Sequence, residues 1–193
     1  MSDPPDPWPP GGAPAWVEAV RRSGQPHAVL LCGLTGSGKT RLARRLEQAL
    51  PAVRFNADEW MIPLFGEHMP RETHDRRFAA VQALEWRTAE RLLELGLHVV
   101  LDYGLWTREA RRMSARQVAA AGGTPLLVFL DVPRAELERR LARRNDARTR
   151  GTYEVTPEML ELFAARFEPP VADEGLPMVR LGPTSDAAVP GGS

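Results

Sequence analysis

The sequence predicts an α/β protein in which a parallel β-sheet is covered by helices on both faces. Short apolar runs alternate with longer segments of helical periodicity, and parallel strands need such crossover helices. A glycine-rich turn directly follows the first apolar run, as at the ligand-binding edge of such sheets. With 193 residues, 43% hydrophobic and 26% charged, the chain suits one globular domain with a full-sized core.

The apolar runs and the helical periodicity give the order of the elements. Strands are expected at 27–32, 53–55, 97–101, 125–130 and 178–181. Helices are expected from the glycine-rich turn to Pro51 and over 72–95, 107–121, 131–144 and 157–167. Right-handed crossovers bring the carboxyl ends of all strands to one edge, where ligands bind. Loops after the strands should therefore converge there.

The turn after the first strand carries the pattern G-x-x-x-x-G-K-S/T. Lys39 within it is the only lysine, and arginine supplies the rest of the 25 basic residues. Glycines let the backbone wrap a phosphate, the lysine reaches the β- and γ-phosphates, and the hydroxyl of Thr40 can bind Mg²⁺. A chance glycine-rich turn is the alternative, but the order strand, loop, helix argues against it. The predicted nucleotide site comprises Gly33, Leu34, Thr35, Gly36, Ser37, Gly38, Lys39, Thr40 and Arg41.

Two aspartates follow neighbouring strands. Asp58 lies in the turn Asn56-Ala57-Asp58-Glu59-Trp60 and can accept a proton from an acceptor hydroxyl, or it can cap a helix. Asp102 ends an apolar strand and can support magnesium through a bound water, or it can cap the strand end. The aromatic residues Trp60, Tyr103 and Trp106 can form walls for an acceptor, although burial in the core is the commoner reason for such rings.

An arginine-rich helix is expected to form a lid over about residues 140–156. Arg140 and Arg144 are four residues apart and share one helix face, and Arg139 and Arg143 share the neighbouring face. One pair facing inward would supply a cation over the transferring phosphate. The alternative is a solvated basic face. The surrounding segment 107–150 holds eleven arginines against five acids, whereas the whole chain has zero formal net charge.

Composition also indicates where the protein works and how it is organised. No apolar run is long enough to cross a bilayer, and the acidic, Pro/Gly-rich start does not resemble a secretory signal. The single cysteine, Cys32, cannot form an internal disulfide and reads as a core residue, which fits a reducing cytoplasm. We expect a cytoplasmic monomer or dimer without membrane contact, with a disordered leader over 1–13 that holds Trp8, a domain over 14–181 and a flexible tail over 182–193.

Taken in order, these features resemble the P-loop kinases and AAA-type ATP-binding proteins that include bacteriophage polynucleotide kinase, chloramphenicol phosphotransferase and zeta toxins. The resemblance covers about residues 27–170 and includes Asp131-Val132-Pro133 after the fourth strand. It implies a three-layer α/β/α domain with sheet order 2-3-1-4-5. It also implies that Asp58 is the general base and that Arg140 and Arg144 contact the nucleotide phosphates, with Lys39 as the fourth catalytic residue.

One departure from that family bears on the acceptor. Polynucleotide kinase has an arginine shortly after its base that holds the substrate's phosphate, and the matching place here is Met61, in an apolar stretch that continues to Phe65. This neighbourhood suits a less charged acceptor.

The leading hypothesis is an ATP- and Mg²⁺-dependent kinase acting on a hydroxyl of a small molecule such as an antibiotic, sugar or nucleoside-like compound. The alternatives are a polynucleotide 5′-hydroxyl kinase, for which the arginines argue, a nucleotide-dependent ATPase switch with a protein partner, and a toxin-like sugar-nucleotide kinase. A guanine-specific Asn-Lys-x-Asp motif does not occur in the sequence, which favours ATP over GTP.

Overall fold

A computed structural model describes residues 13–66, 69–146 and 155–182. Five parallel strands form one sheet in the order β2-β3-β1-β4-β5, which confirms the predicted fold class and strand order. The strands are β1 (His27–Cys32), β2 (Ala52–Phe55), β3 (His98–Gly104), β4 (Thr124–Leu130) and β5 (Met178–Leu181).

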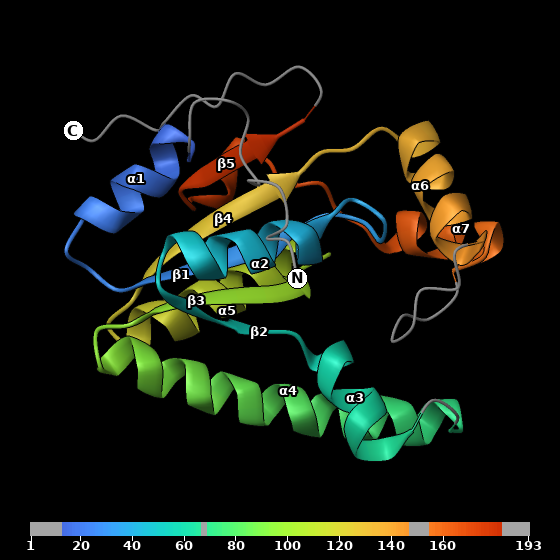
Figure 1. The fold of residues 1–193 in the computed structure, drawn as a ribbon, viewed down its shortest axis with the longest axis horizontal. Helices are drawn as coiled ribbons and strands as arrows, with labels where there is room; N and C mark the ends of the chain where they lie inside the picture. Colours follow the sequence, from blue (N-terminus) through green and yellow to red (C-terminus); the bar gives the residue numbers. More distant parts are fainter. Residues whose placement is uncertain (1–12, 67–68, 147–154, 183–193) are drawn as a thin grey trace, which may run out of the picture.

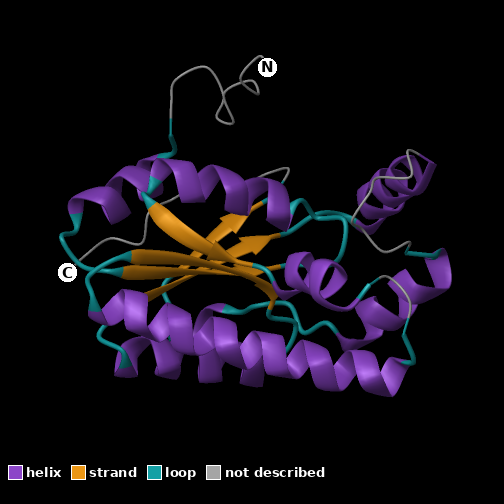
Figure 2. Ribbon diagram, turned by 60° about the horizontal axis from the view of Figure 1, so that its bottom comes forward, coloured by secondary structure: helices purple, strands orange, loops and turns teal. Residues whose placement is uncertain are grey.

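Helices cover both faces of the sheet, so the domain has three layers (Figures 1 and 2). On one face, α1 (Ala15–Arg22) and α2 (Lys39–Ala49) pack against the sheet, and on the other α4 (Arg71–Glu94) and α5 (Arg108–Ala120) do so. Alternate residues of the central strand β1 serve the two faces: Val29 and Leu31 face the first layer, Leu30 and Cys32 the second. This strand is buried from Ala28 onward, as expected for a parallel strand covered on both sides.

Three helices lie beyond the carboxyl ends of the strands (Figure 1). They are α3 (Ala57–Phe65), α6 (Arg134–Asp146) and α7 (Pro157–Arg166), and a short 3₁₀ turn, η1 (Ala172–Glu174), leads into β5. Leu137 and Leu141 of α6 pack with Leu160 of α7 in a small separate core. Thr156 caps α7 with its hydroxyl, and Pro157 occupies the first position, as its sequence predicts.

The third strand is longer than its apolar run predicts and carries an irregularity. It continues to Gly104, so Asp102 lies inside β3 rather than after it. Between β1 and β3 the register pairs Leu30 with Leu101 and then Cys32 with Gly104, so β3 has one extra residue at Asp102–Tyr103. Such a bulge redirects side chains and is common beside functional sites.

Two helices are absent from the expected order of elements. One is α1, in which Trp16 is buried against the first layer of the core. The turn after β2 forms α3, whose N-cap is Asn56, so Asp58 is not the cap residue.

None of the helices in the described ranges is both long and apolar enough to span a membrane. Residues 1–12 with Trp8, 183–193 of the expected tail, and the lid residues 147–154 lie outside the described residues.

Candidate nucleotide-binding and catalytic site

The loop between β1 and α2 has a backbone that requires glycine at defined places. Gly33 has φ +146°, and a Cβ there would lie 2.9 Å from the carbonyl oxygen of Leu130. Gly38 is the N-cap of α2 in the left-handed region. The loop therefore wraps back on the sheet edge and ends at a helix N-terminus, which is the arrangement that binds phosphate through backbone N–H groups.

Lys39 lies at the centre of the charged groups at this edge. Its Nζ donates hydrogen bonds to the carbonyl oxygens of Gly33 at 2.8 Å and Leu34 at 3.0 Å, which are groups of the loop itself. Burial lowers the pKa of Lys39, and the nearby carboxylates of Asp102 and Asp58 oppose this shift. The structure therefore brings the loop, the turn after β2 and the bulge of β3 within electrostatic range of one ammonium group.

Asp102 is buried beside the loop and has two polar partners. The side-chain amide of Asn56 donates to its Oδ2 at 2.7 Å, and the Thr40 hydroxyl lies close enough to favour its charged form. Burial raises the pKa of Asp102, while Thr40 and Lys39 act in the opposite direction. A hydroxyl and a carboxylate next to a phosphate loop fit Mg²⁺, which prefers oxygen ligands and keeps several waters.

Asp58 is in the first turn of α3 and accessible to solvent, although protein surrounds it on most sides. Desolvation raises the pKa of its carboxyl, and the charges of His74 and Lys39 act against this. The neighbouring Glu59 fixes the start of the helix, since its carboxylate accepts hydrogen bonds from Arg54 at 2.7 Å and Arg44 at 2.9 Å. Asp58 therefore has a solvent-accessible carboxylate at a helix start that Glu59 holds in place, and a substrate can reach this carboxylate.

The two arginine pairs of α6 have different surroundings. Arg140 donates to the carbonyl oxygen of Ser37 in the phosphate loop at 3.1 Å and to Glu136 at 2.6 Å. Burial lowers the pKa of Arg144, and its charge acts on Lys39. Arg139 bonds Glu136 on the exposed side of the helix, and Arg143 is also exposed. The pair that faces the loop is therefore Arg140 and Arg144.

The three candidate acceptor aromatics are not brought together. Trp60 is 49% exposed on α3 and lies two residues after Asp58, about 160° around the helix from it. Tyr103 packs near Trp86 of α4, with ring centroids 6.1 Å apart. Trp106 packs on Phe163 of α7 at 5.0 Å. Tyr103 and Trp106 thus pack against different helices while Trp60 is half exposed, and within the described residues no ring contact joins the three.

The apolar stretch after Asp58 also divides between interior and surface. Met61 is fully buried with Ala57 and Val81, where α3 packs on α4. The expectation that Met61 marks an apolar acceptor environment is therefore not supported, because this side chain cannot touch a ligand. Leu64 and Phe65 are exposed, and the Arg77 guanidinium stacks over the Phe65 ring at 4.5 Å. Arg41, placed in the nucleotide site from the motif, is exposed on α2.

Glu85 is a residue near the site that sequence reasoning missed. It lies on the buried stripe of α4 between Val81 and Ala89 and is 1% exposed. Burial raises the pKa of Glu85 to about 7, with Tyr103, the main chain of Asn56, and Asp58 all acting on it. The signal was present in the sequence, because an acid at i+4 spacing within an apolar stripe is placed to be buried.

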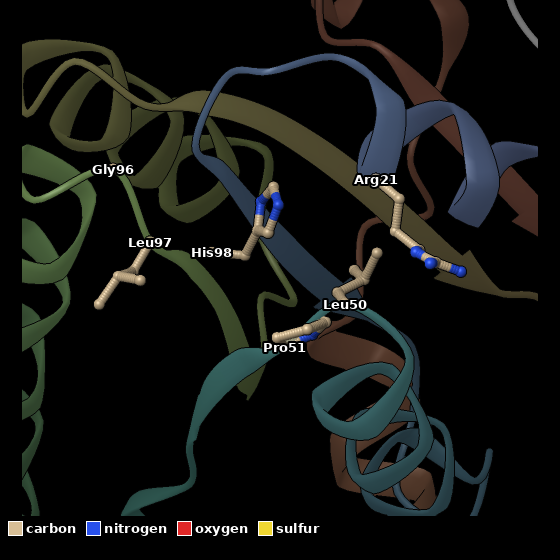
Figure 3. Close-up of a pocket in the computed structure, with 6 residues that line it drawn as sticks. All are labelled: Arg21, Leu50, Pro51, Gly96, Leu97 and His98. Carbon is tan, nitrogen blue, oxygen red and sulfur yellow. The ribbon is translucent and has the colours of Figure 1, made fainter.

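Two cavities lie in different parts of the domain. The larger, of about 300 Å³, is at the amino ends of β2 and β3, where Arg21, Pro51 and His98 are among the lining residues (Figure 3). The smaller, of about 190 Å³, lies beside the phosphate loop between Leu34, Ser37 and the residues from Phe129 to Val132. The larger cavity is thus at the edge of the sheet opposite to the site.

Solved structures with the same architecture include several nucleotide-binding proteins. A candidate kinase from Chloroflexus aurantiacus has a TM-score of 0.66 and 22% identity over 82% of this chain and 88% of that one. Chaetomium thermophilum Kti12 in complex with ADP-AlF3 has a TM-score of 0.61 and 19% identity over 82% and 90%. The Mycobacterium tuberculosis APS kinase CysC in complex with AMPPNP and APS has a TM-score of 0.56 and 22% identity over 84% and 91%.

The structural similarity to these proteins establishes the fold, which is that of P-loop kinases. Among the curated proteins none matches this chain. A family model matches far more than half of the sequence. Residues 29–170, which include the phosphate loop, both aspartates and the inward-facing arginines, match the AAA_33 model, described as an AAA domain, and the chain belongs to that family.

Proposed function

We propose that the protein is an ATP- and Mg²⁺-dependent kinase that transfers the γ-phosphate to a hydroxyl group of a small molecule. The observation that carries this proposal is the accessible carboxylate of Asp58 within electrostatic range of Lys39. A simple nucleotide-binding module has no need for an exposed carboxylate on a fixed helix start near its phosphate loop, whereas phosphoryl transfer to a hydroxyl needs one.

Each group then has a role in one displacement reaction. Asp58 takes the proton of the acceptor hydroxyl while that oxygen bonds to the γ-phosphorus, and the bond from the γ-phosphorus to the β,γ-bridging oxygen breaks as ADP leaves. Lys39 leaves the loop carbonyl oxygens to which its Nζ donates hydrogen bonds and instead holds the β- and γ-phosphates. Arg140 and Arg144 balance the charge that develops on the transferring group. Thr40 and Asp102 would hold Mg²⁺, which shields the phosphate charges.

A small acceptor fits the distribution of charge better than a nucleic acid does. Several of the described arginines of the basic segment are engaged in ion pairs: Arg111 is buried against Glu174, Arg108 pairs with Asp173, and Arg134 pairs with Glu138 and Glu161. A nucleic-acid surface needs a continuous set of basic groups that phosphates can reach. The APS kinase among the structural neighbours holds a nucleotide analogue together with its acceptor, APS, in a domain of this fold.

The test is transfer of radiolabelled γ-phosphate from ATP to a panel of nucleosides, sugars, hydroxylated antibiotics and 5′-hydroxyl oligonucleotides. Asp58→Asn is expected to lower transfer by roughly 10²–10⁴-fold, the range for loss of a general base, with nucleotide affinity retained. Asp173→Asn, an exposed aspartate of η1, is the control and should transfer normally. Near-normal transfer by Asp58→Asn would refute the role of this residue.

The identity of the labelled acceptor separates the remaining candidates. Labelling of oligonucleotides with an affinity that falls steeply with salt would favour the polynucleotide kinase over the small-molecule kinase. Hydrolysis of ATP without any labelled acceptor across the panel would favour the ATPase switch.

A further inference from the structure

Glu85 is buried under conditions that are unfavourable for a carboxyl group. It occupies the middle of the apolar stripe of α4, and within the described residues neither of its oxygens has a hydrogen bond of normal geometry. Burying a polar group without such partners costs free energy, and a charged one costs more. A leucine at this position would suit its helix neighbours, Val81 and Ala89, far better.

The groups that surround Glu85 all belong to the elements that carry the site. The hydroxyl of Tyr103, in the bulge of β3, and the main chain of Asn56, just after β2, lie near its carboxyl. The Tyr103 hydroxyl and the side-chain oxygen of Asn56 are likewise buried without a hydrogen bond of normal geometry within the described residues, so these polar atoms form one cluster. Asp58 and Arg54 act on it electrostatically. The Glu85 carboxyl therefore lies near both Tyr103, the residue after Asp102, and the Asn56 turn, which leads to Asp58.

Asn56 links these contacts to the reaction edge. Its side chain does not cap α3 but donates to Asp102, and Asp58 follows two residues later. A movement of the Asn56 turn would therefore displace both aspartates, one through the side-chain hydrogen bond and the other through the backbone. Misplacement of a reacting group by about 1 Å costs on the order of 10²-fold in rate.

From this geometry we infer that Glu85 is a positioning residue that bridges the Asn56 turn to Tyr103 and so fixes Asp58 and Asp102 relative to the phosphate loop. The inference rests on the proposed function in one respect, the role of Asp58 in transfer. A positioning group of this kind lowers the stability of the fold and raises the rate of the reaction, because its burial is a cost and its contacts are made at the site.

The test replaces Glu85 by two side chains of similar size. Glu85→Leu removes both polar contacts and the buried carboxyl, so thermal unfolding should shift upward by roughly 2–4 °C or more. Hydrolysis of MgATP should fall by about tenfold or more in kcat, with KM for ATP nearly unchanged. Glu85→Gln keeps an acceptor oxygen for the Asn56 N–H and should retain most of kcat. Glu94→Gln, an exposed acid on the same helix, is the control and should change neither quantity.

Replacing a residue with a merely structural role would not raise thermal stability while lowering kcat. Loss of thermal stability together with activity in Glu85→Leu would identify a structural residue and overturn the inference. Unchanged kcat in a more stable Glu85→Leu would also overturn it.

A second measurement does not depend on any activity. The side-chain amide resonance of Asn56, which reports its hydrogen bond to Asp102, should shift in Glu85→Leu and stay in place in Glu94→Gln. Should Asp58→Asn transfer phosphate normally while the Asn56 resonance still responds to Glu85→Leu, the proposed role of Asp58 would fail and the contact of Glu85 with the Asn56 turn would stand. An unshifted resonance would remove the positioning role whatever Asp58 does.

Discussion

The interior of the sheet and its carboxyl edge follow different physical rules, although the same strands form both. In the interior, β1 from Ala28 onward presents only apolar side chains and Cys32 to two helix layers, and burial raises the pKa of the Cys32 thiol to about 11, so this cysteine is an inert core residue. Near the carboxyl edge, polar groups from separate parts of the chain are buried: Ser37, Asn56, Glu85 and Asp102.

That difference indicates what each region is for. Apolar interiors supply most of the free energy of folding, whereas buried polar groups with incomplete partners reduce it. Among the described residues, most of the buried side-chain atoms without a hydrogen bond of normal geometry lie at this edge, including the Ser37 hydroxyl, the side-chain oxygen of Asn56 and the Glu85 carboxyl, whereas the Trp16 indole nitrogen lies in the core. Substitutions in the interior should therefore lower stability, and substitutions at the edge should lower activity.

The largest expected effect is at Lys39. Removing its ammonium in Lys39→Ala takes away the point charge that faces the phosphates, so ATP turnover should fall by about 10³-fold or more, with little change in thermal stability. Lys39→Arg keeps the charge but not the compact shape and should also be strongly impaired. Turnover is measured as ADP release, and wild-type turnover in Lys39→Ala would contradict the assignment of the loop.

Substitutions in the interior of the sheet should lower stability and leave nucleotide binding unchanged. Leu30→Ala truncates a fully buried residue of β1 and should lower the free energy of unfolding by about 2–5 kcal/mol. Leu95→Ala, at an exposed position, should cost less than about 0.5 kcal/mol. Denaturant titration measures both variants, and nucleotide affinity well below the melting temperature should stay near the wild-type value. A Leu30→Ala protein that is as stable as Leu95→Ala would break the distinction between interior and edge.

Glu85 should make stability depend on pH. Its pKa is raised by burial from 4.5 to about 7, so between these values the folded protein holds a proton that the unfolded chain has released. The contribution of Glu85 to stability therefore falls as pH rises through this window, by up to about 3 kcal/mol, and is constant above and below it. Glu85→Gln should remove this part of the slope in unfolding free energies measured from about pH 4.5 to 8. An unchanged slope would mean that Glu85 is not buried as a neutral acid.

The smallest effect distinguishes two arginines on one helix. Arg144→Ala should lower kcat by about 10–100-fold and change ATP affinity less, because its charge is needed most in the transition state. Arg143→Ala, on the exposed side, should change kcat by less than about twofold. Equal effects of the two substitutions would show that the helix does not present one face to the phosphates.

The site itself was only partly predictable. The loop of 33–40 and the positions of Asp58 and Asp102 followed from a motif and from strand ends, because parallel strands bring their carboxyl ends together. Helical spacing paired Arg140 with Arg144 but could not say which pair faces the loop, since both pairs have the same periodicity. Sequence spacing gave no orientation to the three aromatic candidates: Tyr103 packs near α4, Trp106 packs on α7, and Trp60 is half exposed.

The sequence by itself determined the fold, its strand order through the family resemblance, and the phosphate loop. The fold class and the phosphate loop depend on periodicity, on local backbone requirements and on one lysine, which can be read from consecutive residues. Only the tertiary structure decided the bulge at Asp102–Tyr103, the burial of Met61 and the meeting of Glu85 with Asn56. The physical reason is that strand register and helix packing join residues far apart in the chain, and the free energy of those contacts depends on neighbours that local patterns do not specify.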